Sequence, residues 1–378
     1  MHFTRYVGMD IHKKTMTWVA LDVEKKLVGE GKMPMSALGA WAQKYLVKTD
    51  RVVIEATGNS HYVHKVLSEY AGEVLMADPL GMHDRTRGRR KTDRVDAHAL
   101  AEALASDYVK AVWVPDDATW RKREYASHRR ALAEQLTSTK NQLRAVLFRN
   151  GLEYIGRDIT DAKSLQYALD SRMPEMTKGL YQSLWRVSQA LLKEIHRVDC
   201  EISAQGLKDE ECLRLMTMPG VGAHAALIIQ SAIGDINRFE TPQKLASYSG
   251  LVPRVSKSDE SVYYGSITKQ GRSLLRWIMV EAAHAGIMTP GPLKERYERF
   301  KRKGKKHQEA IVAVARHMLE LVWHLMKKKT VFRHARAVYL QTKLRGVLRK
   351  AYGRAPKNAA ATMAKTLMGW KDSPATAT

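Results

Sequence analysis

The sequence has few cysteines, a deficit of acidic residues and no long uncharged apolar run. Its two cysteines, Cys200 and Cys212, are too few for a disulfide scaffold or a four-cysteine zinc site, and they suit a reducing compartment. No apolar segment of the signal-peptide kind precedes Asp10. The most apolar late segment, residues 310–326, is interrupted by Arg316, His317 and Glu320 and is therefore not expected to span a membrane. These absences predict a soluble, cytoplasmic protein that has no membrane partner.

The deficit of acids leaves a large positive charge. The chain has 39 Asp and Glu against 63 Lys and Arg, which gives a formal net charge of +24. A surplus of this size favours a polyanionic partner, either nucleic acid or an anionic membrane surface. The hydrophobic and charged fractions, 44% and 27%, are those of a globular protein. A length of 378 residues exceeds one ordinary core, so we expect two or three domains.

The first 112 residues have the pattern of a mixed sheet covered by helices. Three short β-prone segments with short connections predict an antiparallel meander, and alternating helix and strand candidates follow it. The expected strands are 6–11, 17–23, 27–33, 51–57 and 74–77, and the expected helices are 36–46, 61–70 and 93–104. In such a sheet the fourth strand can lie beside the first.

Four acidic residues stand at the ends of these elements. Asp10 is on the first strand and Glu55 ends the fourth, while Asp93 and Asp96 begin the last helix and share its first turn. Neighbouring carboxylates repel each other unless a cation or a proton separates them. The alternative is structural: Asp93 would be an N-cap, Asp96 a first-turn acid favoured by the helix dipole, and the other two surface acids. A basic run before the pair favours a phosphodiester enzyme, whose cations hold the backbone and whose acids hold metal.

These motifs resemble the DEDD transposases of bacterial insertion sequences. The resemblance rests on residues 8–10 (GMD), 54–58 (IEATG) and 91–97 (KTDRVDA), and the last of these is the most specific. It implies a RuvC-like, ribonuclease-H-type α/β domain over residues 1–112. It also implies catalytic and metal-binding roles for Asp10, Glu55, Asp93 and Asp96. Carboxylate ligands suit Mg²⁺, with Mn²⁺ as the alternative, and we expect two ions.

Residues 113–208 are charged and leucine-bearing. The segments 120–154 and 177–202 predict long amphipathic helices in a hairpin or coiled coil. Such a pair is either a packed spacer or a dimerisation arm. The resemblance favours the arm, and with it a homo-oligomer, either a dimer or a tetramer.

Residues 209–355 predict a mainly helical domain, followed by a flexible tail over 356–378. Residues 219–222 (PGVG) precede an alanine-rich helix, as in a helix-hairpin-helix turn in which Gly220 and Gly222 let the backbone approach a phosphate. A plain helix–helix turn is the alternative. Residues 233–253 and 265–276 resemble the C-terminal transposase domain of the same family.

A polar segment with three serines, residues 254–264, is expected to be a loop. In the family this segment carries a serine nucleophile, usually followed by glycine. Ser258 takes that place, with Asp259 next to it, and Ser256 and Ser261 are the alternatives. A serine hydroxyl needs activation by a base or a metal. The resemblance implies that the serine attacks DNA and forms a phosphoserine intermediate.

Basic residues around these motifs are the candidate nucleic-acid contacts, because cationic side chains bind phosphates without reading sequence. They are Arg87, Arg89, Arg90, Lys91, Arg94, Arg254, Lys257, Lys269, Arg272, Arg276, Lys301, Arg302 and Lys303. The resemblance implies donor and target DNA as partners, and a bridge RNA that guides recombination. The rival functions are a RuvC-like junction nuclease that uses water, and a nucleic-acid-binding protein without catalysis.

Overall fold

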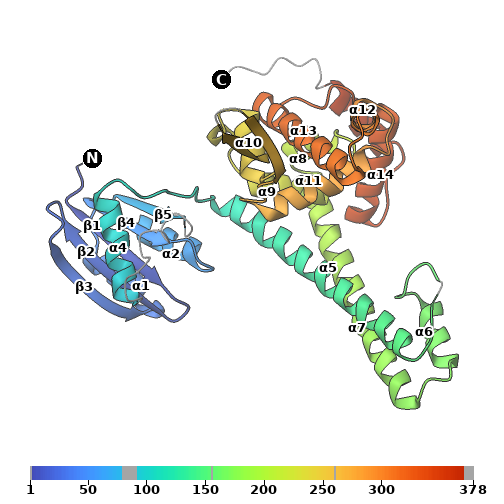
Figure 1. Cartoon of the computed structure of the whole chain (residues 1–378), viewed down its shortest axis with the longest axis horizontal. Helices are drawn as coiled ribbons and strands as arrows, with labels where there is room; N and C mark the ends of the chain where they lie inside the picture. The colour runs from blue at the N-terminus through green and yellow to red at the C-terminus, as the bar shows by residue number, and fades with distance from the viewer. Residues whose placement is uncertain (1, 79–91, 155, 259–260, 370–378) are drawn as a thin grey trace. The chain divides into compact units, whose positions relative to one another are not determined.

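The computed structural model describes residues 2–78, 92–154, 156–258 and 261–369. The chain forms two compact units, Met1–Pro115 and Asp116–Thr378 (Figure 1).

The N-terminal unit is built on a five-stranded sheet with the order β3-β2-β1-β4-β5. Its strands are β1 (Arg5–Ile11), β2 (Thr15–Asp22), β3 (Leu27–Pro34), β4 (Asp50–Glu55) and β5 (Glu73–Ala77). The strands β1, β2 and β3 are antiparallel neighbours, whereas β4 runs parallel to β1 and β5 parallel to β4. The predicted mixed sheet, with the fourth strand beside the first, is confirmed.

Helices cover both faces of this sheet. The 3₁₀ turn η1 (Met35–Ala37) and the helices α1 (Leu38–Tyr45) and α2 (Ser60–Ser68) lie on one face, where their apolar side chains pack with Met9 and Ile54. Helix α4 (Asp93–Ala105) lies on the other face, where Leu100 and Leu104 pack with Val53. Because side chains alternate along a strand, the residues of β1 and β4 next to Met9 and Ile54 face α4.

Gly8 lets α4 lie directly on β1. A Cβ atom at Gly8 would be 2.2 Å from the carbonyl oxygen of Ala97 and 2.4 Å from the nitrogen of Ala101. The two alanines are fully buried, so small side chains on the helix match the missing side chain on the strand. This close packing fixes where the N-terminus of α4 lies over the sheet.

The C-terminal unit begins with a long helical hairpin, seen as the extended green arm in Figure 1. It consists of α5 (Asp117–Arg149) and α7 (Glu175–Gly206), with α6 (Ala162–Asp170) at its tip. A small core of α5, α6 and α7 side chains, including Leu143 and Tyr181, closes the tip. The two long helices expected from the sequence are therefore present.

The rest of this unit is a helical core, as predicted. Its helices are α8 (Glu210–Met216), α9 (Ala223–Ile233), η2 (Ile236–Arg238), α10 (Pro242–Ser249), α11 (Ser273–Gly286), α12 (Pro292–Arg302), α13 (His307–Lys328), α14 (Ala337–Tyr352) and α15 (Ala359–Gly369). Ile228 and Ile229 of α9 and Val314 and Met318 of α13 are fully buried members of this core. Among the described helices, none has the length and apolarity needed to cross a bilayer.

The serine segment is a hairpin and not the expected loop. Strands β6 (Pro253–Ser258) and β7 (Ser261–Ile267) pair antiparallel. The segment contains valine and tyrosine among its serines, and these residue types favour strands. Their β-propensity outweighs the turn preference of serine, on which the expectation of a loop was based.

The expectation of a flexible tail from residue 356 is wrong for Ala359–Gly369. These residues form α15, whose Ala360, Ala364 and Leu367 are buried in the main core. The spacing of four and three residues places all three side chains on one helix face.

Candidate metal centre

A row of polar side chains crosses the sheet on the α4 face. Asp10 of β1 lies opposite Thr17 of β2, and Thr17 lies opposite Lys32 of β3. On the other side of β1, Met9 pairs with Ile54, so Glu55 at the end of β4 follows in register beside Asp10. The register thus brings two of the four predicted acids onto neighbouring strands.

The first turn of α4 adds the other two acids. Thr92 is the N-cap and accepts a hydrogen bond from the Val95 nitrogen, so the cap is Thr92 and not Asp93. Asp93 and Asp96 then occupy the first turn. Since α4 packs directly on β1, its first turn lies beside the end of that strand.

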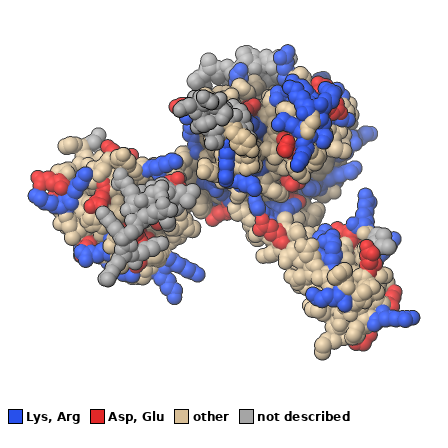
Figure 2. Space-filling view, viewed as in Figure 1, with Lys and Arg blue, Asp and Glu red and all other residues tan. Residues whose placement is uncertain are grey.

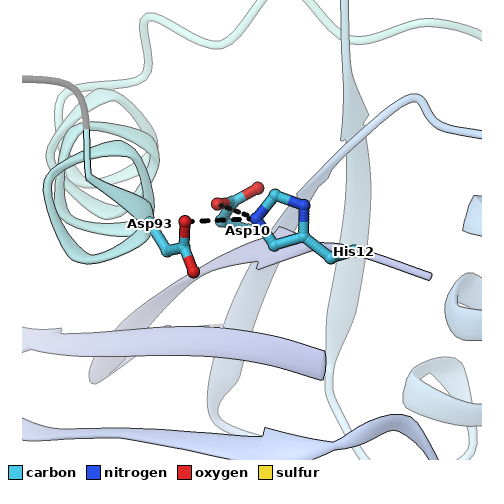
Figure 3. A group of neighbouring side chains, drawn as sticks. All are labelled: Asp10, His12 and Asp93. Atoms are coloured by element: carbon cyan, nitrogen blue, oxygen red, sulfur yellow. Dashed lines mark ion pairs between the residues drawn. The ribbon is translucent and has the colours of Figure 1, made fainter. Parts of the chain in front are cut away.

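His12 joins Asp10 and Asp93 in one cluster (Figure 3). Its Nε2 atom is 3.2 Å from Oδ2 of Asp10 and 3.2 Å from Oδ1 of Asp93. A single nitrogen thus lies between two carboxylates, where a cation would be electrostatically favoured. The sequence analysis missed His12, although its spacing of two from Asp10 was the available signal, since residues i and i+2 of a strand share a face.

The surroundings shift the pKa values of Asp10 and Asp93 in opposite directions. Burial raises the pKa of Asp10, and nearby Asp93 and Asp96 raise it further against the opposing effect of His12. Hydrogen bonds from Lys32 and His12 lower the pKa of Asp93. A buried carboxyl with a raised pKa beside a like charge is a site where bound cations stabilise the ionised form.

The cluster fits a divalent metal ion. The ligand atoms of Asp10, His12 and Asp93 lie within 4.8 Å of one another. Carboxylate oxygens are preferred by Mg²⁺, and Mn²⁺ also accepts an imidazole nitrogen. Asp96 is near enough to affect the pKa of Asp10, and Glu55 follows next in the row.

The serine candidates belong to the other unit. Ser258 ends β6 and pairs with Ser261, the first residue of β7, while Ser256 pairs with Tyr263. The side chains of these serines, and residues 259–260 between the strands, lie outside the described part of the chain. The hairpin nevertheless places Ser258 next to its turn, at the end of the two-stranded ribbon.

The predicted phosphate contacts of the N-terminal unit fall in two groups. Arg87, Arg89, Arg90 and Lys91 lie outside the described residues. Arg94 is described: its Nε donates to Oε2 of Glu30 at 2.7 Å, at the start of α4.

The predicted contacts of the C-terminal unit differ in their environment. Arg272 donates to the Tyr248 hydroxyl and Arg276 to the Ser249 carbonyl, so both also brace the fold. Arg254 and Lys269 are exposed, and the Lys257 side chain lies outside the described part. Lys301, Arg302 and Lys303 are exposed at the end of α12, where Figure 2 shows Lys and Arg gathered.

The glycine turn between α8 and α9 is partly enclosed. Gly220 has a φ of 81°, and a Cβ atom there would be 2.0 Å from the Ala282 carbonyl oxygen of α11. Its close approach is therefore to a neighbouring helix. Apart from its chain neighbours, no described residue has an atom within 4 Å of the Cβ position at Gly222, so a neighbouring helix does not fill this position.

Comparisons with known proteins identify the same two regions. A family model described as a transposase, of the DEDD type, matches residues 7–149. A second model, described as the transposase IS116/IS110/IS902 family, matches residues 212–298. The first match contains all four predicted acids, and the second contains the serine hairpin.

Curated relatives match over most of their length. The transposase for insertion sequence element IS1111A of Coxiella burnetii is 23% identical over 339 residues, which cover 87% of this chain and 91% of the relative. The pilin gene-inverting protein of Moraxella bovis is 24% identical over 344 residues, or 86% and 97% of the two chains. The transposase for insertion sequence element IS1328 of Yersinia enterocolitica is 24% identical over 288 residues, or 74% and 85%. With both family models matched in order, the chain belongs to the IS116/IS110/IS902 family of transposases and is a DNA transposase/recombinase.

Proposed function

We propose that the chain cuts and rejoins DNA strands at a composite site, with acids from the N-terminal unit and a serine from the C-terminal unit. The observation that carries the proposal is that Asp10 and Asp93, which are 83 positions apart in the sequence, lie in one cluster with His12. Asp96 and Glu55 extend the cluster. The strand order, with an antiparallel meander and a parallel β4 beside β1, supports the RuvC-like fold implied by the resemblance.

The acids act as metal ligands in this proposal. Two Mg²⁺ or Mn²⁺ ions held by Asp10, Glu55, Asp93 and Asp96 would supply Lewis acidity to the scissile phosphate. An ion there would offset the burial and the like charges that raise the pKa of Asp10, and so would favour its ionised form. His12 supplies a nitrogen ligand or holds the two carboxylates apart when the ion is absent.

The serine carries the covalent step. The Ser258 oxygen forms a bond to phosphorus, and the bond from phosphorus to one strand end breaks. The serine proton passes to a carboxylate of the acid cluster, and the departing strand oxygen takes up a proton. In the reverse step, the hydroxyl of an exchanged strand attacks the phosphoserine and releases the serine. The number of phosphate ester bonds is conserved, so rejoining needs no external energy source.

Nucleic acids and a second copy of the chain are the proposed partners. The net charge of +24 and the exposed cations after α12 support contacts to DNA and to a guide RNA. A protein that leaves sequence recognition to base pairing needs mainly backbone contacts. Phe148 and Met176 are 82% and 90% exposed at the tip of the α5–α7 hairpin, which supports an oligomeric arm.

The serine role is tested with Ser258→Ala. Nucleic acid that co-purifies with the chain is sequenced first, which identifies the DNA ends and any guide. With those ends as substrate, we expect the wild type to form a protein–DNA adduct that resists denaturation and the variant to form none. Ser256→Ala and Ser261→Ala are the matched controls. Full strand exchange by Ser258→Ala would remove the serine from the mechanism. Cutting without an adduct in the wild type would favour the water-using nuclease.

The metal role is tested with Asp93→Asn. The protein is titrated with Mn²⁺, and binding is measured as the decrease in the electron paramagnetic resonance signal of unbound Mn²⁺. This measurement needs no substrate. We expect the variant to bind at least tenfold more weakly than the wild type, because one carboxylate ligand is lost. Asp22→Asn is the control, because Asp22 ends strand β2 and is not part of the acid cluster. Equal Mn²⁺ affinity in wild type and Asp93→Asn would contradict the assignment.

A further inference from the structure

A cavity of about 630 Å³ lies beside the acid cluster. Strands β2 and β3 contribute Thr17, Glu30 and Lys32 to its lining, and the start of α4 contributes Thr92, Asp93 and Arg94. Its size is within the range of roughly 300–1,000 Å³ that small-molecule sites occupy. The cavity shares Asp93 with the cluster, and Thr17 is the β2 neighbour of Asp10.

Thr17, which belongs to the lining of this cavity, has a buried hydroxyl. The residue is only 6% exposed, and its Oγ1 atom has no hydrogen-bond partner among the residues that the structure describes. A buried hydroxyl without a partner is disfavoured, so native proteins seldom retain one unless a ligand or water uses it. The row Asp10, Thr17 and Lys32 thus has an acid at one end, a cation at the other and an unsatisfied donor between them.

Two cations flank the hydroxyl, and each rests on an internal carboxylate. Lys32 Nζ is 2.8 Å from Oδ2 of Asp93, with side chains that are 57% and 37% exposed. Arg94 Nε is 2.7 Å from Oε2 of Glu30, with side chains that are 67% and 37% exposed. Exposed ion pairs of this kind contribute little to stability, so a competing anion can displace them at little cost. Any divalent ion on Asp93 also competes with Lys32 for that carboxylate.

We propose that this cavity is the phosphate-binding half of the active site, where Lys32, Arg94 and Thr17 hold the backbone of the DNA strand to be cut. The inference rests on the proposed strand-cutting function and adds where the strand lies. Lys32 and Arg94 leave their carboxylates to contact non-bridging phosphate oxygens, and the Thr17 hydroxyl donates a third hydrogen bond. The metal-binding acids then lie on β1, β4 and the start of α4. The phosphate-binding groups are Thr17 on β2, Lys32 on β3 and Arg94 on α4.

The local test is the reactivity of the Lys32 amine. The full chain is treated with an acetylating N-hydroxysuccinimide ester, with and without a short single-stranded oligodeoxynucleotide of mixed sequence, in Ca²⁺ to limit cutting. Mass spectrometry reports the rate at each lysine. We expect the oligonucleotide to slow acetylation of Lys32 at least fivefold and to leave Lys26 unchanged. Lys26 is the matched control, because it forms an exposed pair with Glu24 on the same unit. Equal Lys32 rates with and without the oligonucleotide would overturn the proposal.

Variants test the contact independently. Lys32→Gln is expected to weaken oligonucleotide binding about tenfold and to reduce the slope of log affinity against log salt by roughly 0.7, the value for one phosphate contact to a single strand. Lys26→Gln is expected to change neither. Thr17→Val keeps the side-chain shape and removes the hydroxyl, so it should weaken binding several-fold without lowering the melting temperature. Unchanged affinity in both Lys32→Gln and Thr17→Val would also overturn the proposal.

Mn²⁺ binding separates this inference from the proposed function. Lys32→Gln and Thr17→Val are expected to bind Mn²⁺ at least as well as the wild type, because neither removes a metal ligand and Lys32 competes with the ion for Asp93, whereas Asp93→Asn loses the ion. If Asp93→Asn still binds Mn²⁺, the proposed metal site is wrong, and the acetylation rate of Lys32 still tests the phosphate site. If Lys32 is not protected while Asp93→Asn loses Mn²⁺, only the phosphate site fails.

Discussion

Lys343 is a half-buried side chain that holds the glycine turn between α8 and α9. Its Nζ donates to the carbonyl oxygens of Met216, Met218 and Val221 at 2.6, 2.7 and 2.9 Å. An ammonium group has three N–H donors, so all three are used. The carbonyl of Met216 ends α8, where the helix dipole also favours a cation. One side chain therefore fixes the turn that contains Gly222.

Replacing Lys343 should therefore destabilise the C-terminal unit. Lys343→Ala removes one donor from each of the three carbonyls, of which Met218 keeps the Val221 N–H, and we expect a loss of about 3 kcal/mol in the free energy of unfolding. Urea denaturation followed by circular dichroism measures it. Lys350→Ala is the control on the same helix, because Lys350 is half exposed and lies 3.7 Å from Asp199. A loss below about 1 kcal/mol for Lys343→Ala would show that water satisfies these carbonyls.

Asp199 links the pH of the solution to the stability of the hairpin. Burial alone would raise the pKa of Asp199, but the hydrogen bonds and charge of Arg129 hold it below its usual value. A lowered folded pKa means that the stabilisation is present above the unfolded pKa of about 3.9 and is lost as pH falls through the folded value. Asp199→Asn should therefore unfold with a shallower pH dependence than the wild type below about pH 4.

The matched control for Asp199 is Glu194→Gln, also on α7. Glu194 pairs with Arg197 on the surface, where the side chains are 38% and 54% exposed, so this variant should differ little from the wild type at neutral pH. Urea melts across the acid range test both variants. Parallel pH profiles for wild type and Asp199→Asn would refute the linkage. The Arg129–Asp199 contact joins residues 70 positions apart, so no local pattern predicted it.

At the scale of elements, Gly8 controls where α4 lies. A side chain at this position would meet backbone atoms of Ala97 and Ala101, which cannot rotate away. Gly8→Ala should therefore shift α4 and cost about 2–3 kcal/mol, in the range of overpacked cores. Because the shift moves Asp93 from Asp10, Mn²⁺ affinity should also fall. Gly39→Ala, at an open position on α1, is the control. Unchanged Mn²⁺ binding in Gly8→Ala would separate α4 packing from the site.

The sequence predicted the elements that follow strict patterns. The β-branched run before Glu55 and the turn residues after it predicted β4 and its acid, and the structure places them beside β1. The contribution of Thr17 and Lys32 was not predicted, because it depends on register between strands. Local propensity does not specify register. The β6–β7 hairpin was missed because the prediction weighed its serines above its strand-favouring valine and tyrosine. Helix α15 was missed because the prediction overlooked the helix propensity of its alanines and the apolar face that the core buries.

At the scale of the whole molecule, the acids and the candidate serine lie on different units, joined where the first unit ends at Pro115. Catalysis at a composite site requires these units to meet, within one copy or between copies. An oligomer would fix that meeting. Among the large apolar side chains that the structure describes in the C-terminal unit, the two most exposed, Met176 and Phe148, belong to the α5–α7 hairpin.

The hairpin tip should therefore set the oligomeric state. Phe148→Ser combined with Met176→Ser removes apolar surface that is not part of the folded core, so stability should change by less than about 0.5 kcal/mol. We expect light scattering after size exclusion to show a loss of the oligomer, and strand exchange to fall at least tenfold while Mn²⁺ binding is unchanged. Met288→Ser is the control, because Met288 is 78% exposed and lies outside the hairpin. An oligomer that survives the double substitution would place the interface elsewhere, and the composite site would then have to form without the arm.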